Sequence, residues 1–174
     1  MVTLKEGRII DSWSQLIEGG QAEAEGFFES AEQYLAMSQA PGVTWKREGV
    51  APGMLKGLFG KRRDFLMVTA ERFDDYMVCI GARPYGTYLD ACWFWSGSKK
   101  AAIVDLLGKI PGAALGVNAY SLMQNLDVFD QLDLTAFVDV TRAAVRRATD
   151  ALIAKLNIDP TRINWSTRGT GRNL

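Results

Sequence analysis

The fold of this chain is decided by residues 64–96, which read DFLMVTAERFDDYMVCIGARPYGTYLDACWFWS. This stretch contains three apolar runs rich in β-branched and aromatic residues, at positions 64–71, 76–82 and 87–96. Only four residues separate each run from the next, and the second separating segment contains a proline and a glycine, which set turn angles. Connections this short join antiparallel neighbours. The stretch therefore predicts an antiparallel meander.

The three predicted strands carry apolar residues on both faces. In the first strand, Phe65 and Met67 alternate with Leu66 and Val68, and successive side chains of a strand point to opposite sides. An antiparallel sheet with one face in water shows a regular alternation of apolar and polar residues instead. We therefore expect both faces of this sheet to be covered, by helices, by a second subunit or by a ligand.

Two further elements are expected upstream of the meander. Alternating residues at 43–47 predict a fourth strand. The spacing of Trp13, Leu16 and Ile17 predicts a helix over residues 12–39. A pair of glycines interrupts this segment, and glycine is unfavourable inside a helix. The predicted helix is therefore kinked or divided in two.

Downstream of the meander, an apolar stripe that includes Phe137 and Val145 predicts a long helix over residues 133–156. Asp133 is its expected N-cap, because a carboxylate at this position accepts a hydrogen bond from a free amide of the first turn. A short helix is expected at 99–110. These elements predict one α+β domain: an antiparallel four-stranded meander flanked by an N-terminal helix and a long C-terminal helix.

The domain is expected to span residues 1–160, followed by a loose basic tail at 161–174 that has little to bury after Trp165. The chain has 174 residues, of which 48% are hydrophobic, and 20 basic side chains balance 20 acidic ones. There is no histidine, which excludes Ser-His-Asp catalysis and metal sites built on imidazole. No cofactor is predicted. The absence of a secretory signal or an apolar run of about 18 residues predicts a cytoplasmic protein without a membrane span.

The connection at 49–63 combines four glycines with four cations, a composition that suits phosphate groups. It is not a Walker A loop, because Arg62 stands where that motif needs serine or threonine. The apolar residues of this loop suggest that it folds back onto the sheet or contacts a partner. The candidate contacts for a partner or an anion are Lys56, Leu58, Phe59, Lys61, Arg62 and Arg63. Nucleic acid is possible but not favoured, because the net charge is zero.

Asp90 is the only charged residue inside an otherwise apolar run, so its carboxylate needs a partner if its face is covered. Arg72 and Arg83 are the candidate partners near the turns of the same meander. Trp93 and Trp95 are candidates for stacking a planar ligand, although large core residues are the simpler interpretation. These five residues form the candidate pocket. A structural ion pair is favoured over a catalytic carboxylate.

Charge is also segregated along the chain. Residues 11–40 contain six acids and no Lys or Arg, whereas residues 46–63 contain six bases and one acid. This pattern either steers a charged protein partner or forms two solvated surfaces that partly neutralise each other. The second interpretation is favoured.

The absence of histidine and of any cofactor motif favours a non-catalytic binding or assembly module. We expect it to associate with itself, as a dimer, through one face of the sheet, although the partner could be another protein. The competing expectation is that residues 99–131 fold over that face. The alternative functions are an enzyme with a carboxylate and arginine pocket over the sheet, and an anion or nucleic-acid binder that uses the 49–63 loop.

Overall fold

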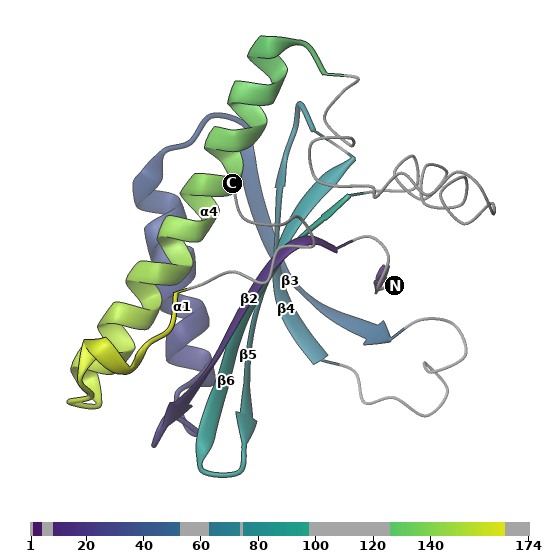
Figure 1. The fold of residues 1–174 in the computed structure, drawn as a ribbon. Helices are drawn as coiled ribbons and strands as arrows, with labels where there is room; N and C mark the ends of the chain where they lie inside the picture. The colour runs from purple at the N-terminus through teal and green to yellow at the C-terminus, as the bar shows by residue number, and fades with distance from the viewer. Residues whose placement is uncertain (1, 5–8, 53–62, 74, 98–125, 166–174) are drawn as a thin grey trace, which may run out of the picture.

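The computed structural model describes residues 2–4, 9–52, 63–73, 75–97 and 126–165. These residues form one six-stranded sheet in the order β1-β3-β4-β5-β6-β2, and two long helices (Figure 1). The strands are β1 (Val2–Leu4), β2 (Ile9–Glu18), β3 (Val43–Pro52), β4 (Arg63–Ala70), β5 (Tyr76–Tyr85) and β6 (Tyr88–Gly97). The helices are α1 (Ala24–Ser38), α4 (Val128–Lys155) and the short 3-10 helix η2 (Pro160–Arg162).

The predicted meander is confirmed. Strands β3, β4, β5 and β6 are consecutive antiparallel neighbours, with Val68 opposite Val78 and Ile80 opposite Trp93. Gly86 lies in the two-residue link between β5 and β6 with φ at 62°, a left-handed conformation that glycine adopts without strain. The sheet is larger than the four strands predicted, because β2 pairs antiparallel with β6 and β1 pairs parallel with β3.

The helix predicted at 12–39 is wrong in its first half, which forms strand β2. Trp13 and Ile17 are buried, and the residues between them pair with β6. The spacing of these two side chains fits either period, because residues four apart share a face in a helix and in a strand. Leu16 distinguishes the two, since 46% of its surface is exposed. The glycine pair follows the end of β2, where Gly19 has φ at 75°.

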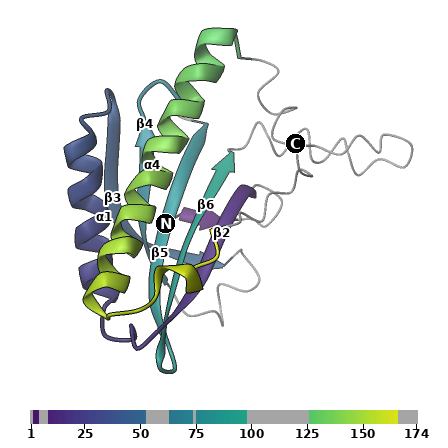
Figure 2. The same cartoon turned by 60° about the vertical axis from the view of Figure 1, so that its left-hand side comes forward.

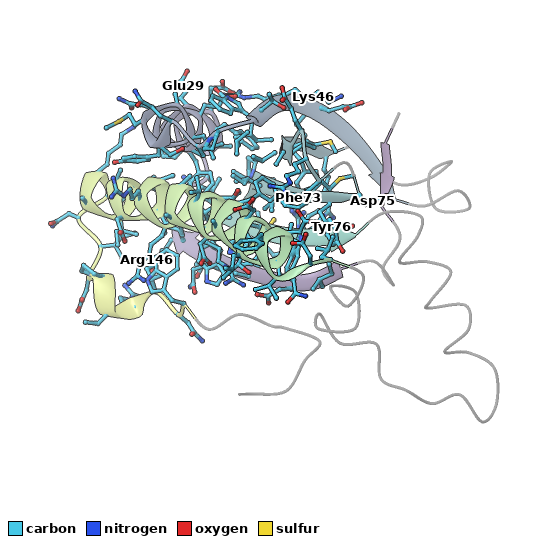
Figure 3. All side chains as sticks on the ribbon, turned by 90° about the horizontal axis from the view of Figure 1, so that it is seen from above. Glu29, Lys46, Phe73, Asp75, Tyr76 and Arg146 are labelled. Atoms are coloured by element: carbon cyan, nitrogen blue, oxygen red, sulfur yellow. The ribbon has the colours of Figure 1, made fainter. Side chains whose placement is uncertain are left out.

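Both long helices lie on the same face of the sheet (Figures 1 and 2). Side chains from the helices and the sheet fill the layer between them, as the view from above shows (Figure 3). Phe137, Val138 and Val145 of α4 are buried there, as predicted from the sequence. Phe27 and Leu35 of α1 belong to the same core. Within the described residues, no helix is long and apolar enough to cross a membrane.

Helix α4 begins earlier than predicted. Its N-cap is Asp127 rather than Asp133, and the Asp127 carboxylate accepts a hydrogen bond of 2.8 Å from the amide of Asp130. The first turn carries exposed apolar side chains, so no buried stripe marks it in the sequence. The helix ends at Lys155, and Asn157 follows with φ at 55°. The short helix expected at 99–110 lies outside the described residues.

The segment after α4 is attached to strand β2. Trp165 stacks on Trp13 with ring centroids 4.9 Å apart, and the Trp13 indole N–H donates a 2.7 Å hydrogen bond to the carbonyl of Asn164. Ile163 is buried. The chain is therefore held up to Trp165, where the sequence predicted a loose tail from residue 161.

Candidate functional site

The sheet face opposite α1 and α4 is called the second face here. Its centre holds a small apolar cluster in which Met67 and Cys79 are buried and Phe65, Met77 and Phe94 are half-buried. The rings of Phe65 and Phe94 meet edge to face with centroids 5.4 Å apart. These side chains come from three adjacent strands, β4, β5 and β6, because alternate residues of a strand share a face. The second face is therefore apolar at its centre, as the sequence predicted.

Gly81 of β5 makes this packing possible. A Cβ atom at Gly81 would lie 2.5 Å from the Phe65 ring and 2.9 Å from the Cys92 sulfur. Both distances are shorter than van der Waals contact, so any larger residue would displace the ring or the thiol. The Phe65 ring thus occupies the space above the glycine, and the apolar cluster continues to the edge of a polar region.

That polar region is centred on an ion pair between Arg83 of β5 and Asp90 of β6, which are directly opposite each other in the sheet. Both Nε and Nη2 of Arg83 donate to the same carboxylate oxygen, Oδ2, at 2.8 Å. The Arg83 guanidinium also lies 5.3 Å from the centre of the Tyr85 ring. In the described part of the chain, Oδ1 of Asp90 and Nη1 of Arg83 have no protein partner. The pair therefore keeps the Oδ1 acceptor and the N–H donors of Nη1 for a ligand.

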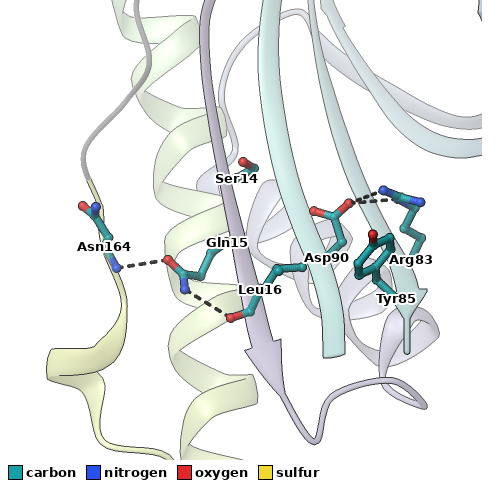
Figure 4. Close-up of a pocket in the computed structure, with 7 residues that line it drawn as sticks. All are labelled: Ser14, Gln15, Leu16, Arg83, Tyr85, Asp90 and Asn164. Atoms are coloured by element: carbon teal, nitrogen blue, oxygen red, sulfur yellow. Dashed lines mark hydrogen bonds and ion pairs between the residues drawn. The ribbon is translucent and has the colours of Figure 1, made fainter. Parts of the chain in front are cut away.

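Two hollows meet at this ion pair. The first, of about 570 Å³, is shown in Figure 4 and is lined by Ser14, Gln15, Leu16, Arg83, Tyr85, Asp90 and Asn164. The second, of about 450 Å³, shares Arg83 and Asp90 and extends past Gly81 and Cys92 to Phe65. Arg63 and Asp64 at the start of β4 also line it. The second hollow therefore joins the ion pair to Phe65 of the apolar cluster, and its other side is lined by Ala24, Glu25 and Phe28 of α1.

The thiol in this site is not an activated nucleophile. Burial raises the pKa of Cys92 to about 12, and the nearby charge of Asp90 adds to that rise. Burial also raises the pKa of Cys79 to about 12. Both cysteines are free thiols and stay protonated at neutral pH. Among the described residues there is also no group of three or more metal-ligating side chains.

The comparisons with known proteins find no match. No protein-family model, curated protein or solved structure matches this chain. The chemistry of the site is therefore argued from its own residues.

The structure brings only two of the five predicted pocket residues together, Asp90 and Arg83. Arg72 instead forms ion pairs of 2.7 Å with Asp130 and Asp133 of α4. Trp93 and Trp95 are buried in the core under the helices. They cannot share a site with Asp90, because residues at odd and even positions of β6 point to opposite faces.

The predicted contacts of the 49–63 connection are only partly described. Arg63 is exposed at the start of β4 and lines the second hollow. The other candidates, Lys56, Leu58, Phe59, Lys61 and Arg62, lie outside the described residues.

The sequence analysis missed the residues that β2 and the C-terminal segment contribute. Gln15 accepts a 3.2 Å hydrogen bond from the amide of Asn164, and its own amide donates to the Leu16 carbonyl at 3.1 Å (Figure 4). Ser14 is exposed opposite Cys92. These residues were missed because β2 was predicted as a helix. Gln15 lies on the same sheet face as Trp13 and Ile17, so the apolar alternation that would indicate a strand is interrupted there.

Proposed function

We propose that this protein is a non-catalytic binding module that acts through the second face of its sheet, and that its partner is a second copy of the same chain. One observation carries the proposal: α1 and α4 both lie on one face, while the opposite face holds an apolar cluster of its own. Phe65, Met77 and Phe94 belong to a cluster that is separate from the core under α1 and α4. A second copy supplies the apolar surface that these side chains lack from α1 and α4.

The size of the second face supports this partner. Five strands about 4.8 Å apart and about eight residues long, at 3.3 Å per residue, cover about 500 Å² in projection. Side chains that stand up from the sheet expose more surface than that projection. A stable interface needs about 800 Å² of accessible surface from each partner. A two-fold axis through this face allows one patch to complement itself.

The Arg83–Asp90 pair supports a protein partner over a free anion. The pair is neutral as a whole, so it does not attract a phosphate as an unpaired arginine does. Its open Nη1 donor and Oδ1 acceptor match a partner that offers one acceptor and one donor. A backbone amide does so, and so does the same ion pair of a second copy across a two-fold axis.

The test is the mass of the protein in solution, measured by light scattering at micromolar concentration. We expect twice the chain mass of 19.2 kDa. Met77→Lys, in the apolar cluster, and Ser14→Arg, at its exposed margin, should each reduce the mass to that of one chain. Thr135→Arg, on the exposed surface of α4, is the matched control and should leave the dimer intact. A wild-type mass near 19 kDa contradicts the proposal, whatever the masses of the variants.

A second candidate function is an enzyme that uses Asp90, and one observation favours it. Asp90 lines a polar hollow of about 570 Å³, large enough for a small ligand. The Arg83 guanidinium argues against a catalytic role for Asp90, because it donates two hydrogen bonds to Oδ2 of the Asp90 carboxylate. The test is hydrolysis of nitrophenyl esters, phosphates and glycosides by the wild type and by Asp90→Asn. Turnover that the variant loses would support the enzyme, and turnover that it keeps would exclude Asp90.

A further inference from the structure

The face of α4 that points away from the sheet carries a row of six residues, four of them apolar and two charged. Its members, called the seam here, are spaced alternately four and three residues apart: Phe129, Asp133, Ala136, Val140, Ala143 and Arg147. This spacing keeps one stripe of a helix aligned along a neighbouring helix, and is typical of coiled-coil contacts. The buried stripe that packs on the sheet uses other residues, among them Leu134 and Val145. The seam is therefore not explained by the core.

The seam lies beside a groove that runs along α4. The other side of the groove is formed by the end of α1, which lies next to α4 on the sheet (Figures 1 and 3), by the connection at 39–42 and by the turn after β4. Two hollows, of about 610 Å³ and 270 Å³, share Ser38 and Val140 and so follow each other along the groove. Met37 forms its lip on α1 and is 64% exposed. Phe129, at the start of the seam, is 74% exposed. Within the hollows the seam presents the exposed Ala136 and Ala143 and the half-buried Val140, whereas Phe129 lies beyond them.

The two ends of the groove differ in charge. At one end Glu71 and Asp133 line the larger hollow together with Arg72, and Arg72 also pairs with Asp130. Three carboxylates and one guanidinium leave this end with a net charge of about −2 at neutral pH. At the other end Arg147 lies 5.7 Å from the centre of the Tyr34 ring. A ligand that spans the groove therefore needs cationic groups over the acidic end.

We propose that this groove docks an amphipathic helix of a partner protein, with apolar side chains along the seam and lysines or arginines over Glu71 and Asp133. Residues Asp133 and Arg147 are about 21 Å apart along the helix axis at 1.5 Å per residue. A partner helix of about four turns covers this length. Apolar anchors that repeat every three and four residues are the usual way in which a helix occupies such a groove.

The test uses two fluorescent 15-residue peptides that carry leucine at the repeat positions and either lysine or glutamate at all others. Binding is measured by fluorescence anisotropy. We expect the leucine–lysine peptide to bind the wild type at least tenfold more tightly than the leucine–glutamate peptide. Val140→Arg fills the centre of the groove and should weaken binding of the leucine–lysine peptide at least tenfold. Glu71→Lys should reduce the preference for lysine.

Thr135→Arg is the matched control, because Thr135 is exposed on the same helix but is not part of the seam. It should bind the leucine–lysine peptide as the wild type does. If circular dichroism shows that Val140→Arg does not fold, Ala143→Arg replaces it, since Ala143 is already exposed. Equal binding by the wild type and the folded groove variant overturns the proposal. So does a lower mass of the Val140→Arg variant than of the wild type, both measured without peptide, since a second copy would then occupy the groove.

Discussion

At the scale of single residues, two glycines of this chain have opposite roles. Gly81 has the Phe65 ring and the Cys92 sulfur directly above it, whereas the nearest atom to a Cβ at Gly26 of α1 is a flexible carboxylate oxygen at 3.5 Å. Gly81→Ala should therefore destabilise the protein by about 1–3 kcal/mol through overpacking. Gly26→Ala should stabilise it by up to about 1 kcal/mol, because alanine favours a helix. Urea unfolding of both variants measures the difference, and equal effects would contradict this packing.

The two free thiols make the stability of the folded protein depend on pH under alkaline conditions. In the folded chain, burial raises the pKa of Cys79 and Cys92 from 9.0 to about 12. Between these values the unfolded chain binds fewer protons than the folded chain, so stability falls as the pH rises. The contribution is fully present below about pH 9 and lost towards about pH 12, with a slope of up to about 1.4 kcal/mol per pH unit for each thiol.

Urea unfolding between pH 8 and pH 10.5 measures this slope. The double variant Cys79→Ala/Cys92→Ala should show a shallower decline than the wild type, although it starts from a lower stability. The buried Cys79 thiol should react with a disulfide reagent at pH 8 only after unfolding, whereas the half-buried Cys92 thiol lines the second hollow. Rapid labelling of Cys79 in the folded protein would show that this thiol is accessible.

At the scale of elements, the sequence predicts strands β4, β5 and β6 well because their turns are short and their runs are mostly apolar. It fails at β2, whose partner β6 lies far away in the sequence, so nothing local distinguishes a strand from a helix there. The same limit applies to the site. Asp90 and Arg83 face each other across one hairpin and could be predicted as a pair. Gln15 and Asn164 meet through tertiary packing that no local pattern encodes.

The N-cap of α4 is Asp127, whereas the sequence predicted Asp133, and the two residues can be compared by mutation. Asp127 bonds a free amide of the first turn, so Asp127→Ala should cost about 1 kcal/mol. Asp133 bonds only the exposed Arg72 side chain, and an ion pair of this kind contributes between about 0 and 1 kcal/mol. Thermal unfolding of the two alanine variants compares them. A larger loss in Asp133→Ala than in Asp127→Ala would restore the cap predicted from the sequence.

At the scale of the whole molecule, the segregated charges of the sequence meet in the fold. Arg47, from the basic segment, forms ion pairs with Glu25 and Glu32, from the acidic segment. Lys155 of α4 likewise pairs with Glu23 before α1. At Arg47 the acidic and basic segments neutralise each other, whereas Lys155 lies outside the basic segment. Each pair is solvent-accessible, so the pairs orient the elements more than they stabilise them.

The proposed dimer has a thermodynamic consequence that complements its mass. If folding and association are coupled, the melting temperature rises with protein concentration, because mass action favours the associated state. A tenfold increase in concentration should stabilise the dimer by about 1.4 kcal/mol, and calorimetry at several concentrations detects the resulting shift. Met77→Lys should remove the dependence. A wild-type melting temperature that is independent of concentration would contradict coupled association.

The pairing of β2 with β6 also determines how the chain folds as it is made. Roughly 80 residues separate the two strands, and synthesis at about 5–20 residues per second takes roughly 4–16 seconds to supply them. The apolar side chains of β2 leave the ribosome before β6, the strand that pairs with β2, has been synthesised; they are Ile10, Trp13 and Ile17. The nascent N-terminal segment therefore exposes apolar side chains and has no strand to pair with. Chaperones that bind such segments should associate with this chain until Gly97 has emerged.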